Sequence, residues 1–356
     1  MSRHPRENIL AEDVHNILTA PLPWSDLVDT RVLVTGASGM ISSYIVHALM
    51  ELGERTNRSV HVTALVRNER RAADVFKMYF ARDNFDLLVQ DVIDEIPNRH
   101  PFDYTFHGAS QASPKYFASN PVGTISANVL GTYSTIEASR ATSRGYVFLS
   151  SGEVYGRHCS PVVSETSFGP LDPLEPRASY PESKRLGEAL AVAWWREYGF
   201  PAKIARIFHT YGPGMALDDG RVFADFVSDV IHGRDITIKG NAEVRRAFCY
   251  ISDTVRGLFT ILLAGDAGEA YNIGNPSAAM SVGELAALLA SLPNSTITTS
   301  IVRSALSSSP TSANPQLSTL PDVSKLQALG WIPIIRPRDG FSRTINALAA
   351  AHDIAI

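Results

Sequence analysis

The feature that most constrains the fold is an alternation of short apolar runs with helical patterns between residues 31 and 208. The helical patterns cover 40–53, 68–80, 121–141 and 179–198, and the apolar runs around them read RVLVTG, VHVTALV, DLLVQDV, YTFHGAS, GYVFLSS and AKIARIF. Parallel strands need helical crossovers to connect them, so this alternation is typical of a parallel sheet covered on both faces. The sequence therefore predicts an α/β fold with a Rossmann-like, doubly wound parallel sheet.

The flanking segments do not continue this rhythm. Residues 1–29 are predicted to be an N-terminal extension with a short helix in AEDVHNIL, and 30–210 a dinucleotide-binding Rossmann domain to which parts of 245–265 return. Residues 211–356 are predicted to form mainly a smaller α/β substrate-binding domain, with helices at 222–233 and 282–291 and in DVSKLQALGW. The Ser/Thr/Pro-rich stretch 293–321 is typical of loops and short strands.

The composition argues against several classes of protein. The chain has 356 residues, 45% hydrophobic and 19% charged, with a net charge of −4, which is typical of a globular protein and not of a basic nucleic-acid-binding one. The N-terminus lacks the apolar core of a signal peptide, and the longest apolar run, LFTILLAG, is too short to span a bilayer. Cys159 and Cys249 have neither metal-binding nor disulfide-rich spacing. We therefore expect a cytoplasmic protein with no nucleic-acid partner, no membrane partner and no metal.

The first apolar run ends in TGASGMIS, which has the features of a phosphate-binding loop. Gly36 is expected to make the tight turn, and Gly39 to let the next helix pack close to a pyrophosphate resting on the amides at its N-terminus. Ser42 stands where the fingerprint has a third small residue and is large enough to loosen this packing. The strand before the loop and the helix after it make the glycine pattern specific. The predicted cofactor contacts here are Gly36, Ser38, Gly39, Met40 and Ile41.

The second strand ends in ALVRNERRA, where an NAD site usually has an acidic residue for the adenosine ribose. Arg67 stands there instead. An arginine at this place can bind a 2′-phosphate, which makes NADP an alternative to NAD, or it can stack on adenine or face solvent. Asp91, in VQDV, is a candidate adenine contact, with a solvated loop aspartate as the alternative.

Three residues predict a site of proton transfer. Tyr180 and Lys184 are four apart on a predicted helix and so share a face, and both are also candidate cofactor contacts. A tyrosine that takes a proton from a sugar hydroxyl needs its pKa lowered from about 10, which a lysine cation one turn away and a positive nicotinamide ring would do. Ser151, at the end of an earlier strand, would hydrogen-bond the same hydroxyl.

With these motifs the chain resembles the extended short-chain dehydrogenase/reductase family of NAD-dependent nucleotide-sugar epimerases, dehydratases and decarboxylases, over about residues 30–345. The resemblance rests on TGASGMIS, HGASQASP, NVLGT, SSGEVYG, YPESK, ARIFHTYGPGM, DDGRV, RRAFCYISD and LGW, and the text looks most like that of UDP-glucuronate decarboxylases. It implies that bound NAD+ takes hydride from carbon 4 of a nucleotide-diphosphate sugar while the tyrosine removes the hydroxyl proton. It adds Val92, Ala109 and Ser110 as cofactor contacts, and Ser113, His209, Arg221 and Arg246 as substrate contacts.

The stretch LSSGEVYG bears on the step that follows the oxidation. The 4,6-dehydratases of the family have Thr-Asp-Glu here, with the aspartate as acid, whereas this chain has Gly152, which cannot donate a proton, before Glu153. Simple 4-epimerases generally lack the glutamate, and the decarboxylases have Thr-Ser-Glu. The resemblance thus favours decarboxylation over dehydration or epimerisation, with Ser151, Glu153, Tyr180 and Lys184 as catalytic residues. The alternative for Glu153 is that it only structures the loop.

Three positions depart from the decarboxylase pattern. His209 replaces an asparagine that binds the sugar diphosphate, Gly214 replaces an arginine, and Thr319 stands where an arginine often precedes Pro-Asp. Each change removes a strong hydrogen bond, so we expect the substrate to be held differently from that of an ordinary decarboxylase. Arg246 matches the family's diphosphate-binding arginine and Arg221 lies in a substrate-facing segment, with surface ion pairs as the alternative for both.

Two further expectations concern assembly and class. The helices at 121–141 and 179–198 correspond to a four-helix interface in the family, and Trp194 and Trp195 add apolar surface, which predicts a homodimer. The alternative is that both tryptophans are core residues. A dinucleotide-sensing or scaffold protein that lost the chemistry is the non-enzyme alternative, and the intact Ser151, Tyr180 and Lys184 set argues against it.

Overall fold

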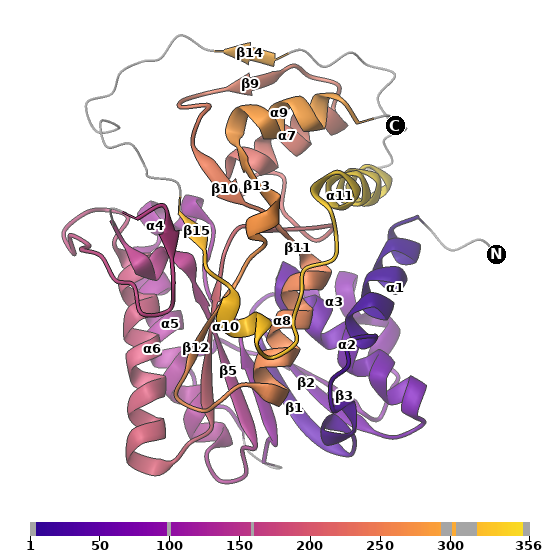
Figure 1. Cartoon of the computed structure of the whole chain (residues 1–356). Helices are drawn as coiled ribbons and strands as arrows, with labels where there is room; N and C mark the ends of the chain where they lie inside the picture. The colour runs from indigo at the N-terminus through magenta and orange to yellow at the C-terminus, as the bar shows by residue number, and fades with distance from the viewer. Residues whose placement is uncertain (1–4, 98–100, 158–159, 293–300, 304–318, 352–356) are drawn as a thin grey trace.

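A seven-stranded parallel sheet forms the centre of the computed structural model, which describes residues 5–97, 101–157, 160–292, 301–303 and 319–351 (Figure 1). The strand order is β12-β7-β5-β4-β1-β2-β3. The strands are β1 (Thr30–Thr35), β2 (Val60–Val66), β3 (Phe85–Val89), β4 (Tyr104–His107), β5 (Gly145–Ser151), β7 (Ala202–Ile207) and β12 (Ala270–Ile273). The predicted doubly wound α/β fold is confirmed.

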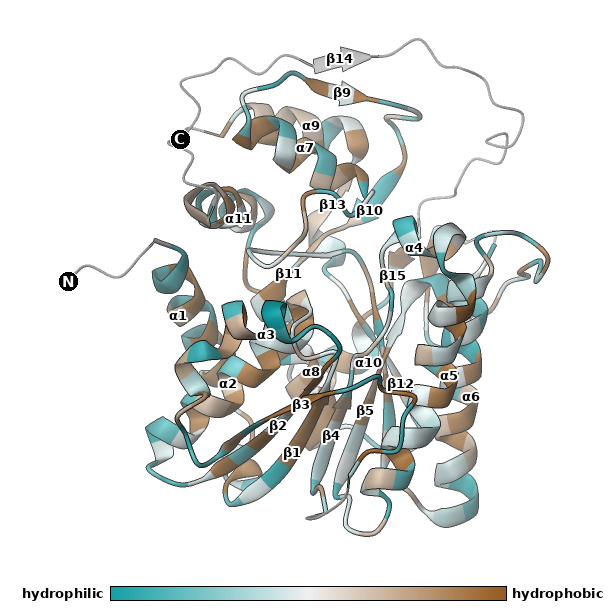
Figure 2. Cartoon of the chain, turned by 180° about the vertical axis from the view of Figure 1, so that it is seen from behind, coloured by the Kyte–Doolittle hydropathy of each residue, from teal (hydrophilic) through white to brown (hydrophobic). Residues whose placement is uncertain are grey.

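Helices cover both faces of this sheet. Helices α5 (Pro121–Ser139) and α6 (Ser179–Tyr198) pack on one face, and α2 (Met40–Thr56) and α8 (Ile251–Ala264) pack on the other (Figure 1). The predicted helix at 68–80 is divided into α3 (Glu69–Phe76) and the 3₁₀ turn η2 (Lys77–Tyr79). Because both faces are covered, the strands are hydrophobic almost throughout, as the colouring of β1 and β2 in Figure 2 shows.

The seventh strand is the one that the sequence analysis missed. Strand β12 pairs with β7 along its whole length, from Ala270 opposite Ile204 to Ile273 opposite Ile207. It has only four residues and follows α8 directly, so its sequence carries too short a pattern to identify a strand. Strand β12 forms because the edge of β7 offers it backbone hydrogen-bond partners, which the local sequence of β12 does not indicate.

A second group of elements lies beyond the carboxyl ends of the strands (Figure 1). The helices predicted at 222–233 and 282–291 are α7 (Val222–Ile231) and α9 (Val282–Ala290). DVSKLQALGW contributes only the short α10 (Ser324–Gln327), which packs beside β12 and α8 instead (Figure 1). Most of the predicted loop stretch 293–321 falls outside the described residues. The remaining elements here are α4 (Pro114–Ser119), η3 (Gly152–Tyr155), β6 (Val162–Val163), β8 (Thr210–Tyr211), β9 (Ile236–Ile238), β10 (Arg245–Ala247), β11 (Cys249–Tyr250), η4 (Pro276–Ala278), β13 (Ala279–Ser281), β14 (Ile301–Arg303), β15 (Leu320–Pro321) and α11 (Pro337–Ala351).

The N-terminal segment packs onto the folded core. Helix α1 (Pro5–Leu18), which is longer than the short helix predicted, contacts α2, α8 and α11 and is followed by the turn η1 (Trp24–Leu27). Val14 and Ile17 are buried in this contact, and so is the carboxylate of Asp13. Oδ2 of Asp13 accepts hydrogen bonds from the hydroxyls of Tyr44, at 3.1 Å, and Tyr250, at 2.8 Å. Among the described helices, none has the length and apolar character needed to cross a membrane.

Candidate active site

A cleft of about 1880 Å³ opens at the carboxyl ends of the central strands, between the sheet and the second group of elements. All of the residues predicted for the cofactor, the substrate and the chemistry line this one cleft. These residues are Gly36, Ser38, Gly39, Met40, Ile41, Arg67, Asp91, Val92, Ala109, Ser110, Ser113, Ser151, Glu153, Tyr180, Lys184, His209, Arg221 and Arg246. Open α/β sheets bind ligands at this edge because loops from both halves of the sheet diverge there.

The loop after β1 has the backbone that a phosphate site needs. Gly36 has a φ of +61°, which favours glycine, and a side chain there would lie 2.7 Å from Cα of Ala109. Gly39 precedes the first residue of α2, so the free amides of this helix end face the cleft. The loop therefore fits the pyrophosphate of a dinucleotide.

The expectation that Ser42 loosens the packing of α2 is corrected by the structure. Ser42 is buried, and its hydroxyl donates to the carbonyl of Thr35 at 3.3 Å. The residue opposite Ser42 is Gly108, and a side chain on Gly108 would collide with the serine hydroxyl. The glycine on β4's exit loop thus makes room for the serine on α2.

Arg67 and Asp91 lie together at the outer end of the cofactor side. Nη1 of Arg67 is 3.7 Å from Oδ2 of Asp91, and both side chains are partly exposed. Asn68 accepts a hydrogen bond from the amide of Arg71 and so caps α3. Arg67 is therefore placed where it could contact an adenosine ribose or its 2′-phosphate. The nearby carboxylate of Asp91 partly neutralises its positive charge.

Tyr180 lies in the first turn of α6 and faces the end of β5. It is buried, its ring stacks on that of Phe117 at 4.6 Å between centroids, and it hydrogen-bonds Ser151. Burial raises the pKa of Tyr180, and Glu153 adds to this, while the bond to Ser151 and the charge of Arg221 act in the opposite direction. In the chain alone the tyrosine is thus held as a neutral phenol.

Lys184 lies one turn further along α6 and is buried too. Its Nζ donates to the carbonyl of Leu149 at 2.6 Å, 4.7 Å from the ring centroid of Phe148 and 5.9 Å from that of Tyr180. Burial lowers the pKa of Lys184 to about 7. The shared helix face predicted from the spacing is confirmed, but the lysine is not among the causes that shift the pKa of the tyrosine in this structure.

Glu153 and two arginines surround the sugar side of the cleft. Glu153 lies in η3, directly after the β5 strand end, and its charge acts on both Tyr180 and Arg246. His209 lies nearby; its surroundings desolvate the ring, and Arg246 and Arg221 add positive charge, so its pKa is lowered to about 3. The imidazole is therefore neutral, and the two arginines supply positive charge on the sugar side of the cleft.

Arg221 and Ser113 connect two loops above the cleft. Nη2 of Arg221 donates to the carbonyl of Ala112 at 2.7 Å, and the hydroxyl of Ser113 donates to the carbonyl of Asp219 at 2.5 Å. Asp219 also lies 3.4 Å from Nη1 of Arg221. Both side chains predicted to contact substrate thus also hold the loop before α4 against the loop before α7.

The positions that depart from the decarboxylase pattern also line the cleft. Thr319 forms a backbone bridge with Arg246, so an arginine at 319 would lie beside the arginine already present. Gly214 faces Met40 of the phosphate loop, and a side chain would lie 3.3 Å from Cγ of that methionine. At Gly152 a Cβ atom would lie 2.9 Å from the ring of Phe208, so the space of the missing aspartate or serine is filled by this ring.

Sequence reasoning missed Phe117, whose ring covers Tyr180. Phe117 lies on α4, about sixty residues before the tyrosine, and no spacing rule connects an aromatic residue there to the site. The described part of the chain contains no cluster of His, Cys, Asp and Glu that could hold a metal ion.

Comparison with known proteins identifies relatives of this chain. Residues 32–274 match the model of the NAD dependent epimerase/dehydratase family. UDP-glucuronic acid decarboxylase 5 of Arabidopsis thaliana is 33% identical over 311 residues, which cover 87% of this chain and 86% of the plant protein.

Solved structures agree with this family in fold. The UDP-glucose 4-epimerase of Thermotoga maritima superposes with a TM-score of 0.76 at 24% identity, covering 90% of this chain and 99% of the epimerase. The UDP-glucuronic acid 4-epimerase of Bacillus cereus, solved in complex with NAD, has a TM-score of 0.73 at 23% identity, covering 89% and 96%. From the match over most of its length and from the close similarity to a decarboxylase, the chain belongs to the NAD-dependent epimerase/dehydratase family.

Proposed function

We propose that this protein is an NAD-dependent enzyme that oxidises carbon 4 of a nucleotide-diphosphate sugar transiently, and that its reaction is the decarboxylation of UDP-glucuronate or a close analogue. The observation that carries the proposal is the convergence of a phosphate loop, the Ser151, Tyr180 and Lys184 set, Glu153 and two arginines on one cleft. The similarity to UDP-glucuronic acid decarboxylases supports the choice of reaction.

The side chains suggest how the first step is divided. Bound NAD+ would accept the hydride from carbon 4, and the reduced cofactor would return it to carbon 4 in the closing reduction. Ser151 would orient the carbon 4 hydroxyl, and the hydroxyl oxygen of Tyr180 would hold the proton that leaves it. Because burial raises the pKa of Tyr180, this step needs positive charge nearby, which Arg221 provides in part and charged Lys184 would increase.

Glu153 would act after the oxidation. A ketone at carbon 4 acidifies carbon 5 and allows a carboxylate on that carbon to leave as carbon dioxide. The electron pair left on carbon 5 must then take up a proton, and Glu153, next to Ser151 and Tyr180, is suited to relay that proton to carbon 5. Arg221 and Arg246 would bind the diphosphate.

Dehydration and epimerisation are the alternative reactions. A 4,6-dehydratase needs an acid next to the glutamate, and Gly152 with the ring of Phe208 packed against it leaves no place for one. Epimerisation at carbon 4 needs no carboxylate, so Glu153 would then be a structural residue. A sensor or scaffold would need the phosphate loop but no tyrosine held for proton transfer.

Incubation of the purified protein with a panel of nucleotide sugars, followed by mass spectrometry, tests the proposal. Loss of carbon dioxide from UDP-glucuronate is the expected result, and Tyr180→Phe protein is the control. Loss of water, or an unchanged mass with a changed retention time, would assign dehydration or epimerisation instead. No change in any sugar by a protein that binds NAD+ would favour the sensor.

We infer that the copies associate through the outer faces of α5 and α6, although Trp194 is not part of these faces. Trp194 is buried and packs against the buried Phe200, so it belongs to the core, whereas Trp195 is half-buried. The same two helices instead expose a set of apolar side chains, Ile125, Leu130, Tyr133, Leu186 and Tyr198. A second copy of this chain is the partner that the family resemblance suggests for such a face.

We further infer which part of the chain binds the cofactor, which part binds the substrate, and in which compartment the protein works. Residues 30–210, with α8, would bind the dinucleotide, and residues 211–356 would mainly bind the sugar nucleotide. Helix α1 of the extension 1–29 packs against α2, α8 and α11. NAD is the expected cofactor, with NADP as an alternative because of Arg67. The two cysteines, of which Cys249 is buried and free, suggest the reducing cytoplasm.

A further inference from the structure

Helix α6 carries a third ionisable side chain in line with its two site residues. Tyr180, Lys184 and Glu188 follow one another at four-residue spacing on the face that packs against the sheet, and they are 6%, 3% and 7% exposed. A buried carboxylate needs partners, because an isolated one would be strongly destabilising. Neither the proposed reaction nor the sequence motifs assign a role to Glu188.

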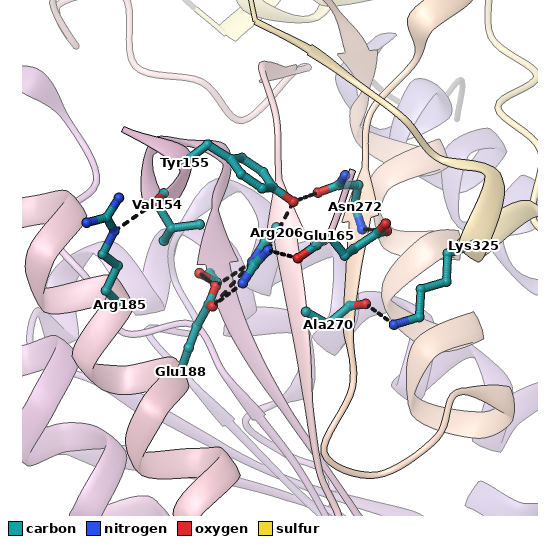
Figure 3. Close-up of polar contacts among 10 residues, drawn as sticks. Val154, Tyr155, Glu165, Arg185, Glu188, Arg206, Ala270, Asn272 and Lys325 are labelled. Carbon is teal, nitrogen blue, oxygen red and sulfur yellow. Dashed lines mark hydrogen bonds and ion pairs between the residues drawn. The ribbon is translucent and has the colours of Figure 1, made fainter. Parts of the chain in front are cut away.

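The carboxylate of Glu188 connects two neighbouring strands, and its contact with Arg206 is drawn in Figure 3. Arg206 on β7 donates to it through Nε, at 3.0 Å from Oε1, and through Nη2, at 2.7 Å from Oε2. The hydroxyl of Ser150 on β5 donates to Oε1 at 2.5 Å. Ser150 and Arg206 are opposite each other in the parallel register, and Ser150 directly precedes the site residue Ser151.

Arg206 continues the network to the far end of the turn that carries Glu153. Its Nη1 donates to the hydroxyl of Tyr155 at 3.1 Å, and this hydroxyl donates to Oδ1 of Asn272 on β12 at 2.6 Å (Figure 3). Tyr155 is the last residue of η3, and Ser151 caps its beginning by accepting the amide of Glu153 at 3.2 Å. The network therefore holds both ends of η3.

Lys184 lies beside this network in an apolar environment. The titratable groups around it are Tyr180 and Glu188 on its own helix and His107 on β4, while β5 presents the carbonyl of Leu149 and the ring of Phe148. His107 has its pKa lowered to about 3 by burial and by Lys184, so it is neutral. Glu188 is thus the negative charge that acts on the lysine, and it opposes the lowering of the lysine pKa by burial.

We propose that Glu188 and Arg206 are a positioning pair for the active site: the Glu188 carboxylate places a negative charge beside Lys184 on the buried face of α6, and the pair fixes the strand end and turn that carry Ser151 and Glu153. The use of the lysine charge in catalysis rests on the proposed function, but the electrostatic link between these residues does not.

The two members of the pair should act on Lys184 with opposite signs. Replacing Glu188 by glutamine leaves Arg206 as an uncompensated cation on the same side of the sheet, which disfavours a second cation at Lys184. Replacing Arg206 by glutamine leaves the Glu188 carboxylate without its partner, which favours the cation. If the pair has only a structural role, both variants would loosen the region, and the titration midpoint of Lys184 would shift in the same direction in both.

Selective 13C labelling of the lysine ε carbons measures this charge directly in the full-length protein. The chain has six lysines, Lys77, Lys115, Lys184, Lys203, Lys239 and Lys325, so the spectrum is simple, and Lys184→Arg assigns the signal. We expect the titration midpoint of Lys184 to fall by about one pH unit in Glu188→Gln and to rise in Arg206→Gln. The double variant, which removes both charges, should titrate between the two.

Two internal controls accompany the titration. Lys203 is also buried, with its pKa lowered to about 8, but its Nζ bonds the carbonyl of Leu262 on α8, on the opposite face of the sheet, so its midpoint should not change. Glu182→Gln removes a carboxylate from the outer part of the same helix, where Glu182 pairs with Arg185, and should leave Lys184 unchanged.

The outcome decides the proposal in every case. A midpoint of Lys184 that is unchanged in Glu188→Gln, or that moves in the same direction in both single variants, overturns it. If one single variant does not fold, the double variant and the other single variant still show in which direction each charge shifts the titration midpoint of Lys184. Because no substrate is added, the result is independent of which sugar the enzyme converts.

Discussion

The buried carboxylate of Asp13 makes the attachment of the N-terminal helix dependent on pH. Burial is the largest influence on this group and raises its pKa from 3.8 to about 6, against the hydrogen bonds from Tyr250 and Tyr44 and the charge of Arg343. The folded protein therefore binds the proton of Asp13 more tightly than the unfolded chain does. The free energy of unfolding should accordingly decrease as the pH rises from 3.8 to about 6.

The size of the effect follows from the difference between the two pKa values. Each pKa unit corresponds to about 1.4 kcal/mol, so the ionised carboxylate costs the folded state about 3 kcal/mol once the pH is well above its folded pKa. About half of this cost is already present near pH 5, because the unfolded chain is ionised there and the folded protein is not. Asp13→Asn removes the cost and keeps an oxygen that accepts from Tyr44 and Tyr250.

Urea unfolding of both proteins near pH 5 and near pH 8 measures the difference. Relative to the wild type, Asp13→Asn should be more stable near pH 8 than near pH 5, by about 1.5 kcal/mol. Asp74→Asn, on the exposed side of α3, is the matched control and should give equal differences at the two pH values. An Asp13→Asn protein that is equally destabilised at both would refute the reasoning, because Asp13 would then be charged in the folded state throughout.

Three further results are expected. Gly152→Ala should lower the stability by about 1–3 kcal/mol in thermal unfolding, because its Cβ would collide with Phe208, and an unchanged melting temperature would show that the ring yields freely. Calorimetric titration should show tighter binding of NAD+ than of NADP+, and Arg67→Ala should weaken the binding of NADP+ only. Binding of NADP+ that is about tenfold tighter than that of NAD+ would show that Arg67, and not the family resemblance, indicates the cofactor. Light scattering at micromolar concentration should give the mass of a dimer, and Leu186→Glu should give a monomer, whereas a monomeric wild type would contradict the proposed interface.

The parts of the fold that repeat a local pattern could be predicted from the sequence. The alternation of apolar runs and helical patterns identified six of the seven sheet strands, because buried parallel strands carry long hydrophobic runs. Strand β12 has no such run and exists because β7 offers an edge. Likewise the short helix expected near Asp13 was visible in the sequence, but the burial of its carboxylate against Tyr44 and Tyr250 depends on packing of distant segments.

The candidate site shows the same division. Tyr180 and Lys184 could be paired from their spacing, and the glycine loop from its place between a strand and a helix. Phe117 and Arg206 could not be linked to the site from spacing, because Phe117 stacks on Tyr180 from a distant segment and Arg206 reaches the site only through Glu188. The homodimer through α5 and α6 stays a prediction, but Trp194 is buried: a tryptophan in a helical stripe does not indicate which side of the stripe packs against the core.

We propose that Tyr180 serves the oxidation at carbon 4 and that Glu153 serves the step after it. Rapid mixing of substrate with the NAD-loaded enzyme, followed by the near-ultraviolet absorbance of reduced nicotinamide, separates these steps. We expect Glu153→Gln to accumulate reduced cofactor while turnover slows by about 100-fold or more, and Tyr180→Phe to form none. Turnover of Glu153→Gln at the wild-type rate would contradict the claim and would leave Glu153 a structural residue of its turn.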